Sequence, residues 1–441
     1  MIADPLVWTL SKQRLAALLL GVGFFTPATF AQPASATAGV SASASSAASI
    51  ASDEKLRQFM QQVRPQPDAA KAGSQAVRDA QSVSAERLAQ RGELLIQGEL
   101  LLSQRRTTEA LAVFERAALI LHAADSEMAI VRGHMQAGDY RRALAFGAHT
   151  AGAHLDVVGG SALYAWLLYA GGQTQVAQRL LAEAQARSAS SPLIAAVSAQ
   201  LATGQPRATA SLLALPTRLA PYGDASGIPP SARVVGSATL LPGGKFALVP
   251  AALVPPGKAG LWLRNGLGQT AEATVTQRLP ALGLAVFSLN TPLPVPDDYT
   301  VAPRDAFAGS IGYAMEYTSL PTPDAAWPLL RSGFLGGLAD ASNPASSWRN
   351  LGLDMPKGPR GGPVFDAAGQ LTGIALPPSA KKGKAGAADL MVPVSVMKVA
   401  LGARLAEPSK APAPPQAAPP PKASMDRVYE SALKSSLQVI R

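Results

Sequence analysis

The arrangement of apolar and polar positions divides the chain into a helical part and a strand-rich part. A helical pattern of apolar residues begins at Ser84 and continues to about residue 204. From Arg233, short runs of Val, Leu and Ala are separated by Pro-Gly-Gly, Pro-Pro-Gly and Asn-Gly-Leu-Gly, which is typical of strands joined by turns. We therefore expect a multidomain α + β protein, with an all-α region over 84–205 and an all-β region over 231–405.

The helical region repeats itself. Ala110, Ala143 and Ala177 each occupy a small-residue position, at intervals of 33 and 34 residues. A period of this length, with a small residue where two helices cross, resembles the tetratricopeptide repeat. The alternative is a generic helical hairpin bundle, whose alanines coincide because the chain is rich in alanine.

The resemblance to tetratricopeptide repeats implies a concave groove that receives peptides or partner helices and is lined by the first helix of each pair. The register of the repeat places Arg132, Met135, Trp166 and Tyr169 on this groove. Trp166 and Tyr169 are the candidate aromatic anchors for a protein partner. The alternative for both is packing in the core between helices.

Histidine occurs only in the helical region. The four histidines of the chain are His122, His134, His149 and His154. Their spacing is not that of metal ligands, and we expect them at the surface or at helix ends. No metal site and no cofactor are predicted. Because the chain contains no cysteine, a Cys-His catalytic pair is excluded as well.

One loop of the strand-rich region, at residues 358–365, reads Gly-Pro-Arg-Gly-Gly-Pro-Val-Phe. It resembles the nucleophile loop of trypsin-like serine proteases, especially the bacterial periplasmic heat-shock type, where Gly-x-Ser-Gly-Gly-Pro precedes two strands joined by a turn. Arg360 stands at the serine position, and a guanidinium remains protonated at ordinary pH and cannot attack a carbonyl. Gly358, Gly361 and Gly362 suit a sharp turn beside the cleft.

Two further segments resemble the same family in the same order. Residues 235–254 resemble the strand pair before the catalytic histidine, and Ala252 stands at the histidine position. Residues 277–289 resemble the strand that carries the aspartate, and Gly283 stands at that position. The resemblance implies two β-barrels, with Arg360 near the other two positions at their junction. Because the whole strand-rich region lacks histidine, it predicts a pseudoprotease and not an enzyme.

Two alternatives remain open at this loop. Arg360 plugs an inactive cleft, which is the interpretation that we favour, or it binds an acidic group of a partner. A Ser-Lys dyad of Ser379 with Lys381 or Lys382 is formally available. The surrounding Pro-Pro-Ser-Ala-Lys-Lys-Gly is typical of a solvated loop, however, which argues against the dyad.

The N-terminal residues predict export. Lys12 and Arg14 precede an apolar run of 11 residues, Pro27 interrupts the apolar pattern, and small residues up to Ala31 offer a cleavage site. We expect a signal peptide over 1–31, with an uncleaved anchor as the alternative, and a location in the periplasm or cell envelope of a bacterium. After cleavage, no remaining segment is long and apolar enough to span a bilayer.

Three segments have the composition of tethers. Residues 32–83 are first rich in Ala and Ser and then charged, residues 206–230 carry Pro and Gly between the two regions, and residues 406–424 are rich in Pro and Ala. Residues 425–441 then combine a helical stripe with the strand-like Leu-Gln-Val-Ile. This segment resembles the opening helix and first strand of the protease domain. It docks back as a permuted strand, pairs with another chain, or forms a frayed end.

The formal net charge of +10 is spread along the chain without a dense basic stripe, so nucleic acid is not an expected partner. We expect an exported, non-catalytic protein that binds or scaffolds protein or peptide partners. One alternative is an active serine-type endopeptidase with an unrecognised or partner-completed active site. Another is a stalk-like structural component of the envelope, in which the tethers matter more than any cleft.

Overall fold

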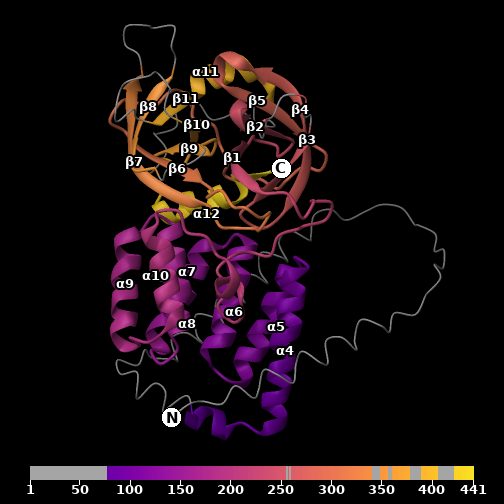
Figure 1. Cartoon of the computed structure of the whole chain (residues 1–441), viewed down its shortest axis with the longest axis vertical. Coiled ribbons are helices and arrows are strands. Elements are labelled where there is room, and N and C mark those ends of the chain that lie inside the picture. The colour runs from indigo at the N-terminus through magenta and orange to yellow at the C-terminus, as the bar shows by residue number, and fades with distance from the viewer. Residues whose placement is uncertain are drawn as a thin grey trace, which may run out of the picture. The chain divides into compact units, whose positions relative to one another are not determined.

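The computed structural model describes residues 77–254, 257, 260–339, 348–355, 360–377, 389–405 and 422–441. The expected signal peptide (1–31), Gly358, the segment Ser379–Lys382 and most of the two outer tethers lie outside these residues. Helices come first along the described chain and strands follow, and one more helix and strand come last (Figure 1). Among the described residues, no helix is both long enough and apolar enough to cross a membrane.

The helical region is built from helices that pack on their neighbours in the sequence. Ala110, Ala143 and Ala177, expected where helices cross, are each 0% exposed. A Cβ added to Gly98 would overlap the ring of Phe114, so glycine permits this close helix approach. Helical repeats are therefore present. The helices are α4 (Ala85–Ser103), α5 (Thr107–Ile120), α6 (Ala124–Ala137), α7 (Tyr140–Ala153), α8 (Val158–Ala170), α9 (Thr174–Arg187) and α10 (Pro192–Ala202).

The strand-rich region folds into two closed antiparallel barrels, as the resemblance implied. The first has the strand order β1-β12-β3-β4-β5-β2 and the second the order β10-β11-β8-β7-β6-β9. The predicted fold class, helices followed by a trypsin-like double barrel, is confirmed. The elements are β1 (Val234–Leu240), β2 (Phe246–Pro250), β3 (Gly260–Asn265), β4 (Thr270–Leu279), β5 (Leu284–Leu289), β6 (Ile311–Glu316), β7 (Leu329–Leu338), β8 (Arg349–Leu353), β9 (Pro363–Asp366), β10 (Leu371–Leu376), β11 (Asp389–Pro393), α11 (Val394–Leu401), α12 (Met425–Ser435) and β12 (Ser436–Ile440).

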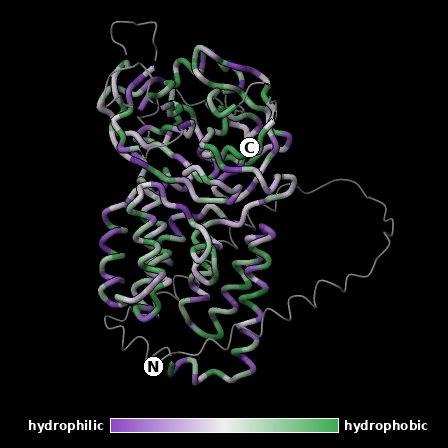
Figure 2. Tube along the Cα trace, in the orientation of Figure 1, coloured by the Kyte–Doolittle hydropathy of each residue, from purple (hydrophilic) through white to green (hydrophobic). Residues whose placement is uncertain are grey.

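Each barrel encloses an apolar core of its own. Val249, Leu263 and Phe287 are fully buried in the first barrel. Leu335 and Val364 belong to the smaller cluster of the second barrel. Figure 2 shows hydrophobic residues recurring along the helices and along the strands of both barrels. Burial of these side chains is the main favourable contribution to folding in each region.

One strand of the first barrel comes from the far end of the sequence. β12 pairs with β1 on one side and with β3 on the other. Leu437 lies opposite Ala238 of β1, Val439 lies opposite Leu263 of β3, and both are fully buried in the barrel core. Of the three possibilities for residues 425–441, docking back onto the β domain as a permuted strand is confirmed.

The helix before this strand joins the helical region to the barrels. The ring centroid of Tyr429 on α12 lies 4.3 Å from that of Tyr140 on α7, and its hydroxyl donates to the carbonyl of Pro328 at 2.9 Å. The guanidinium of Arg141 on α7 lies 3.0 Å from the carboxylate of Glu430. Helix α12 therefore contacts both parts, and Figure 1 shows it between them.

Candidate functional site

The two positions that the resemblance assigned to the catalytic histidine and aspartate, Ala252 and Gly283, lie in segments that contact each other. Ala252 lies in the short 3-10 helix η3 (Ala251–Leu253), which follows β2. Gly283 precedes β5 in a left-handed conformation with φ of 65°. The backbone N–H of Ala251 donates to the carbonyl of Gly283 at 2.8 Å. The backbone alone holds these two positions together, because neither residue has a side chain that can take part.

The loop that carries Arg360 reaches from the second barrel to the first. The hydroxyl of Thr239 on β1 donates to the carbonyl of Gly361 at 2.9 Å. Gly361 has φ of 136°, and a Cβ added there would overlap the ring of Pro250 at the end of β2. Pro250 directly precedes the short helix of Ala252. The loop that contains Arg360 therefore approaches the segment that contains Ala252, and that segment in turn contacts Gly283.

The side chain of Arg360 is bound inside its own domain. Arg360 is 5% exposed, and its Nε and one terminal nitrogen each lie 2.9 Å from an oxygen of Asp389. Asp389 begins β11, and its side chain is 12% exposed. A bidentate guanidinium–carboxylate pair is stronger than an ordinary neutral hydrogen bond. The cation at the nucleophile position is thus neutralised within the domain.

A second carboxylate lies beside the same loop. Glu316, at the end of β6, is 2% exposed and accepts a hydrogen bond from the backbone N–H of Gly362 at 3.2 Å. Burial raises the pKa of its carboxyl to about 7, against the opposing influence of the Ser237 hydroxyl and the Arg360 charge. Near neutral pH this carboxyl therefore exchanges between its charged and neutral forms.

Sequence reasoning missed both carboxylates. Asp389 is 29 residues from Arg360, and Glu316 is 46 residues from Gly362, so no local motif joins them. The one available signal is that each acid stands at the end of an apolar strand: Asp389 before Leu-Met-Val-Pro-Val, and Glu316 after Ile-Gly-Tyr-Ala-Met. That signal shows that an acidic residue stands next to a buried strand, but it does not identify the residue that the acid contacts.

The three positions that the resemblance assigned to the triad can be compared with the requirements of Ser-His-Asp chemistry. That mechanism needs a hydroxyl, an imidazole and a carboxylate in hydrogen-bonded order. The three positions instead hold a guanidinium, a methyl group and a hydrogen atom. No histidine of the chain lies within 231–405. Among the described residues, the junction contains the buried cation of Arg360 with the buried carboxylate of Glu316 and the partly buried carboxylate of Asp389 near it.

The residues expected on the groove of the helical repeats are buried. Each is at most 5% exposed: Arg132, Met135, Trp166 and Tyr169. Tyr169 faces the second barrel, where the guanidinium of Arg331 lies 5.0 Å from its ring centre. The structure therefore differs from the expectation of an open binding surface, and the cause is contact with other parts of the same chain.

The segment expected to be a linker, 206–230, runs against the expected groove. The carbonyl of Pro216 accepts a hydrogen bond from the guanidinium of Arg132. Tyr222 donates its hydroxyl to the carboxylate of Glu99 at 3.0 Å and its backbone N–H to the side chain of Gln136 at 2.9 Å. An internal segment thus makes contacts of the kind that a bound peptide would make.

The expectation for the histidines is correct in part: His134 lies in the last turn of α6 and His154 directly follows α7, so both are at helix ends. The side chains of His134, His149 and His154 are 5, 7 and 9% exposed, so they are not surface groups. His122, His149 and His154 all approach one carboxylate, that of Glu127. Sequence spacing could not reveal this arrangement, because packing of separate elements creates it.

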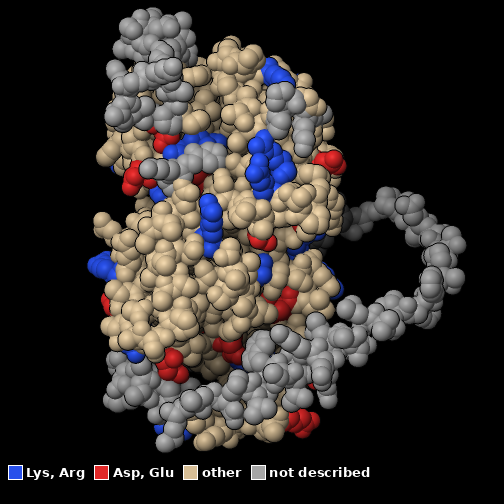
Figure 3. Space-filling view, in the orientation of Figure 1, with Lys and Arg blue, Asp and Glu red and all other residues tan. Residues whose placement is uncertain are grey.

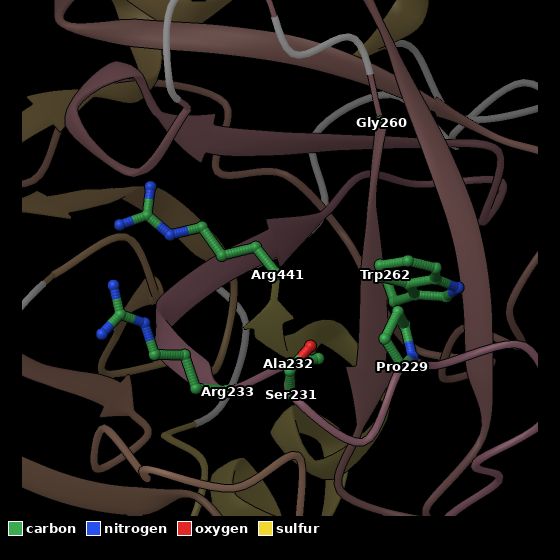
Figure 4. A pocket seen from close by; sticks show the side chains of 7 residues that line it. All are labelled: Pro229, Ser231, Ala232, Arg233, Gly260, Trp262 and Arg441. Carbon is green, nitrogen blue, oxygen red and sulfur yellow. The ribbon is translucent and has the colours of Figure 1, made fainter.

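A pocket of about 570 Å³ opens on the first barrel. It is lined by Pro229, Ser231, Ala232, Arg233, Gly260, Trp262 and Arg441. Figure 4 shows the guanidinium groups of Arg233 and Arg441 on one side and Trp262 on the other. Arg441 also donates to the carbonyl of Leu253 at 3.3 Å, which connects the pocket wall to the helix of Ala252. The two guanidinium groups suit an acidic group of a ligand, and the indole on the opposite side offers an apolar surface.

The charged groups elsewhere on the visible surface are dispersed. On the face seen in Figure 3, the Lys and Arg side chains form separate groups and not one continuous basic surface.

Comparison with solved structures finds protease domains at low similarity. AlgW, an HtrA-type protease with a decapeptide, is 18% identical at a TM-score of 0.30, and the match covers 38% of this chain and 50% of that one. The chain thus spans half the length of AlgW. The MamO protease domain from Magnetospirillum magneticum is 20% identical at a TM-score of 0.28, covering 40% of this chain and 97% of that one. No protein-family model matches the chain, and no curated protein matches it.

Proposed function

We propose that the chain is a pseudoprotease, an exported and non-catalytic protein that binds or scaffolds polypeptide partners. The observation that carries the proposal is the ion pair between Arg360 and Asp389. A cation stands at the nucleophile position, and a nearly buried carboxylate lies 2.9 Å from it. Breaking a buried pair of this kind costs several kcal/mol, so the loop presents no free group for attack on a substrate.

The first barrel is the proposed contact site for a partner. A trypsin-like double barrel can bind an extended peptide by adding it as a strand, without any catalytic group. The pocket beside Trp262, with Arg233 and Arg441 on its opposite side, supports a partner that carries an acidic residue.

The helical repeats are the second proposed contact site. Their period and their small residues at the crossings support the tetratricopeptide type of repeat. Because residues 206–230 contact this groove, a partner there has to displace an internal segment. Tyr222→Ala, which removes the hydrogen bond to Glu99, should then increase partner capture.

The first test separates binding from catalysis. We expect no covalent labelling of the pure chain by a fluorophosphonate probe and no cleavage of casein. Arg360→Ser combined with Asp389→Asn should stay equally inactive, because Ala252 and Gly283 supply no base for the new hydroxyl. Labelling or cleavage by the native chain would establish the alternative, an active serine-type endopeptidase.

The second test concerns the partner. A photo-crosslinking amino acid placed at Trp262 should capture polypeptides from envelope extract, whereas one placed at Leu119, which is 72% exposed on α5, should capture none. Equal capture at both positions would contradict a specific site on the first barrel. Export is tested separately by the mass of the chain from the periplasmic fraction, which should correspond to cleavage after residue 31.

A further inference from the structure

Four side chains from three neighbouring elements of the helical region meet at one point. His122 lies in the connection between α5 and α6, and Glu127 lies in the first turn of α6. His149 lies near the end of α7, and His154 directly follows that helix. Stacking of the repeat therefore assembles a cluster whose members are spread over the sequence.

Each of the three imidazoles directs its Nε2 atom at the carboxylate of Glu127. The Nε2 atoms of His122 and His149 lie 2.6 and 3.3 Å from Oε1 of Glu127. The Nε2 atom of His154 lies 3.3 Å from Oε2. The ring of His122 is 4.7 Å from that of His154 and 5.7 Å from that of His149, measured between centroids. The ligand atoms of His122, Glu127 and His149 all lie within 4.8 Å of one another.

The cluster is unusual because its ionisable side chains are buried. Glu127 is 0% exposed, and the side chains of His149 and His154 are 7 and 9% exposed. Among the described residues, the Nε2 atoms of His149 and His154 and Oε2 of Glu127 have no partner with hydrogen-bond geometry. Buried polar atoms that converge without such bonds are costly unless something else satisfies them.

We propose that His122, His149, His154 and Glu127 form a structural site for a transition-metal ion of the Zn²⁺ class. Three imidazoles and one carboxylate are a donor set for Zn²⁺ and its first-row neighbours, whereas Ca²⁺ and Mg²⁺ prefer oxygen ligands alone. Four protein ligands fill a tetrahedral shell, which is typical of structural zinc sites.

The ligand atoms of His122, Glu127 and His149 already form one group, whereas His154 lies outside that group and its Nε2 has to move toward the other three to complete the shell. In a tetrahedral site with bonds of about 2.0–2.1 Å, neighbouring ligand atoms are about 3.3–3.4 Å apart. The two carboxylate oxygens are already 3.3 Å from Nε2 of His149 and of His154. The contact of His122 with Glu127 has to open by less than an ångström. His122 is the most exposed of the four, at 21% of its side chain, and gives an ion access from solvent.

A bound ion would take the carboxylate of Glu127 and neutral imidazoles as ligands, so metal binding here would release any proton that these groups hold. Bound there, the ion would connect the α5–α6 turn to the end of α7.

The test is metal binding by the full chain, produced without a histidine tag and stripped with EDTA. Zn²⁺ titrated by calorimetry should bind at one equivalent and raise the melting temperature. Co²⁺ should give the visible absorption of a four-coordinate site. His122→Asn should weaken Zn²⁺ binding by at least about 100-fold, because loss even of an outer-sphere partner costs 10–100-fold.

The chain supplies its own controls. His134→Asn removes a histidine that is paired with Asp139 outside the cluster, and it should leave Zn²⁺ binding unchanged. His122→Asn is chosen because this side chain is partly exposed, and its melting temperature in EDTA should match that of the native chain. No stoichiometric binding by the native chain would overturn the proposal, as would equal loss of binding in His134→Asn and His122→Asn.

Discussion

The rings of Tyr140 and Tyr429 pack against each other with their centroids 4.3 Å apart. The next residues along the chain, Arg141 and Glu430, also form a pair, and 289 residues separate them in the sequence. Both tyrosines are 0% exposed. The hydroxyl of Tyr140 donates to the carbonyl of Leu167 at 2.9 Å. This contact connects the helical region to the last helix of the chain.

The tyrosine contact should show energetic coupling. Tyr140→Leu and Tyr429→Leu should each destabilise the chain, and their combined effect should be smaller than the sum by about 1 kcal/mol, the usual value for an aromatic pair. Urea unfolding of the four proteins of the double-mutant cycle measures this difference. Additive effects would mean that the two regions unfold independently of this contact.

Residues 425–441 should act as a separable part of the first barrel. A chain that ends at residue 424 should lose cooperative unfolding of the β domain, because β1 and β3 then lack the strand that pairs with both. Addition of a synthetic peptide of residues 425–441 should restore it, as measured by near-ultraviolet circular dichroism. A peptide with Leu437→Lys and Val439→Lys should fail, since both side chains are buried in the core.

The pair of Arg360 and Asp389 should matter for stability. Asp389→Asn removes one carboxylate that binds a guanidinium of 5% exposure, and the expected cost is about 1–3 kcal/mol of unfolding free energy. Denaturant titration measures it. The control is Glu109→Gln, which breaks a fully exposed pair with Arg106 and should have no measurable effect. An Asp389→Asn variant as stable as the native chain would contradict the importance of the pair.

Glu316 should make stability fall as the pH rises toward neutrality. Its folded-state pKa of about 7 exceeds the ordinary value of 4.5. Between these values the folded state binds more protons than the unfolded state, so the unfolding free energy decreases with pH, by up to roughly 3 kcal/mol. Glu316→Gln should remove this contribution. The check is the difference between native and variant stability from pH 4 to 8, and a difference that is constant over this range would contradict the assignment.

Trp166 should behave as a core residue. At 5% exposure, its truncation to Ala should cost about 3–5 kcal/mol of folding stability. Leu119→Ala on the exposed face of α5 is the control and should change stability by about 0.5 kcal/mol or less. If Trp166→Ala leaves the melting temperature unchanged and reduces partner capture, Trp166 is an anchor in an open groove after all.

The sequence was sufficient to predict structure where the requirement involves residues that are close together in the chain. The turn at Gly361 and Gly362 marked the loop between the barrels, and the apolar positions of Leu437 and Val439 marked a strand, although the sequence did not decide between docking on this chain, pairing with another chain and a frayed end. Side-chain partners across the fold were different. Whether Arg360 meets Asp389, or Glu127 meets three imidazoles, depends on which strand or helix lies next to which. No periodicity carries that information, because it arises only when the elements pack.

The expected groove of the helical repeats is a second case in which the sequence pattern did not identify the contacting residues. The helical period placed Arg132 on a groove for a partner, whereas in the structure its guanidinium donates to the carbonyl of Pro216 in the same chain. Residues 206–230 have the Pro and Gly content of a linker, and their composition does not show that Tyr222 can reach Glu99 and Gln136. The segment that occupies the groove is determined by three-dimensional complementarity, and the periodicity of the sequence does not contain this information.

Because β12 is at the C-terminal end of the sequence, the two barrels become complete at different times during translation. All six strands of the second barrel emerge before the strand that closes the first. Until residues 436–440 follow, β1 and β3 present unpaired backbone edges, the kind of surface that promotes aggregation and recruits chaperones. A nascent chain interrupted before this point therefore carries an open first barrel, however well its helices and its second barrel have folded.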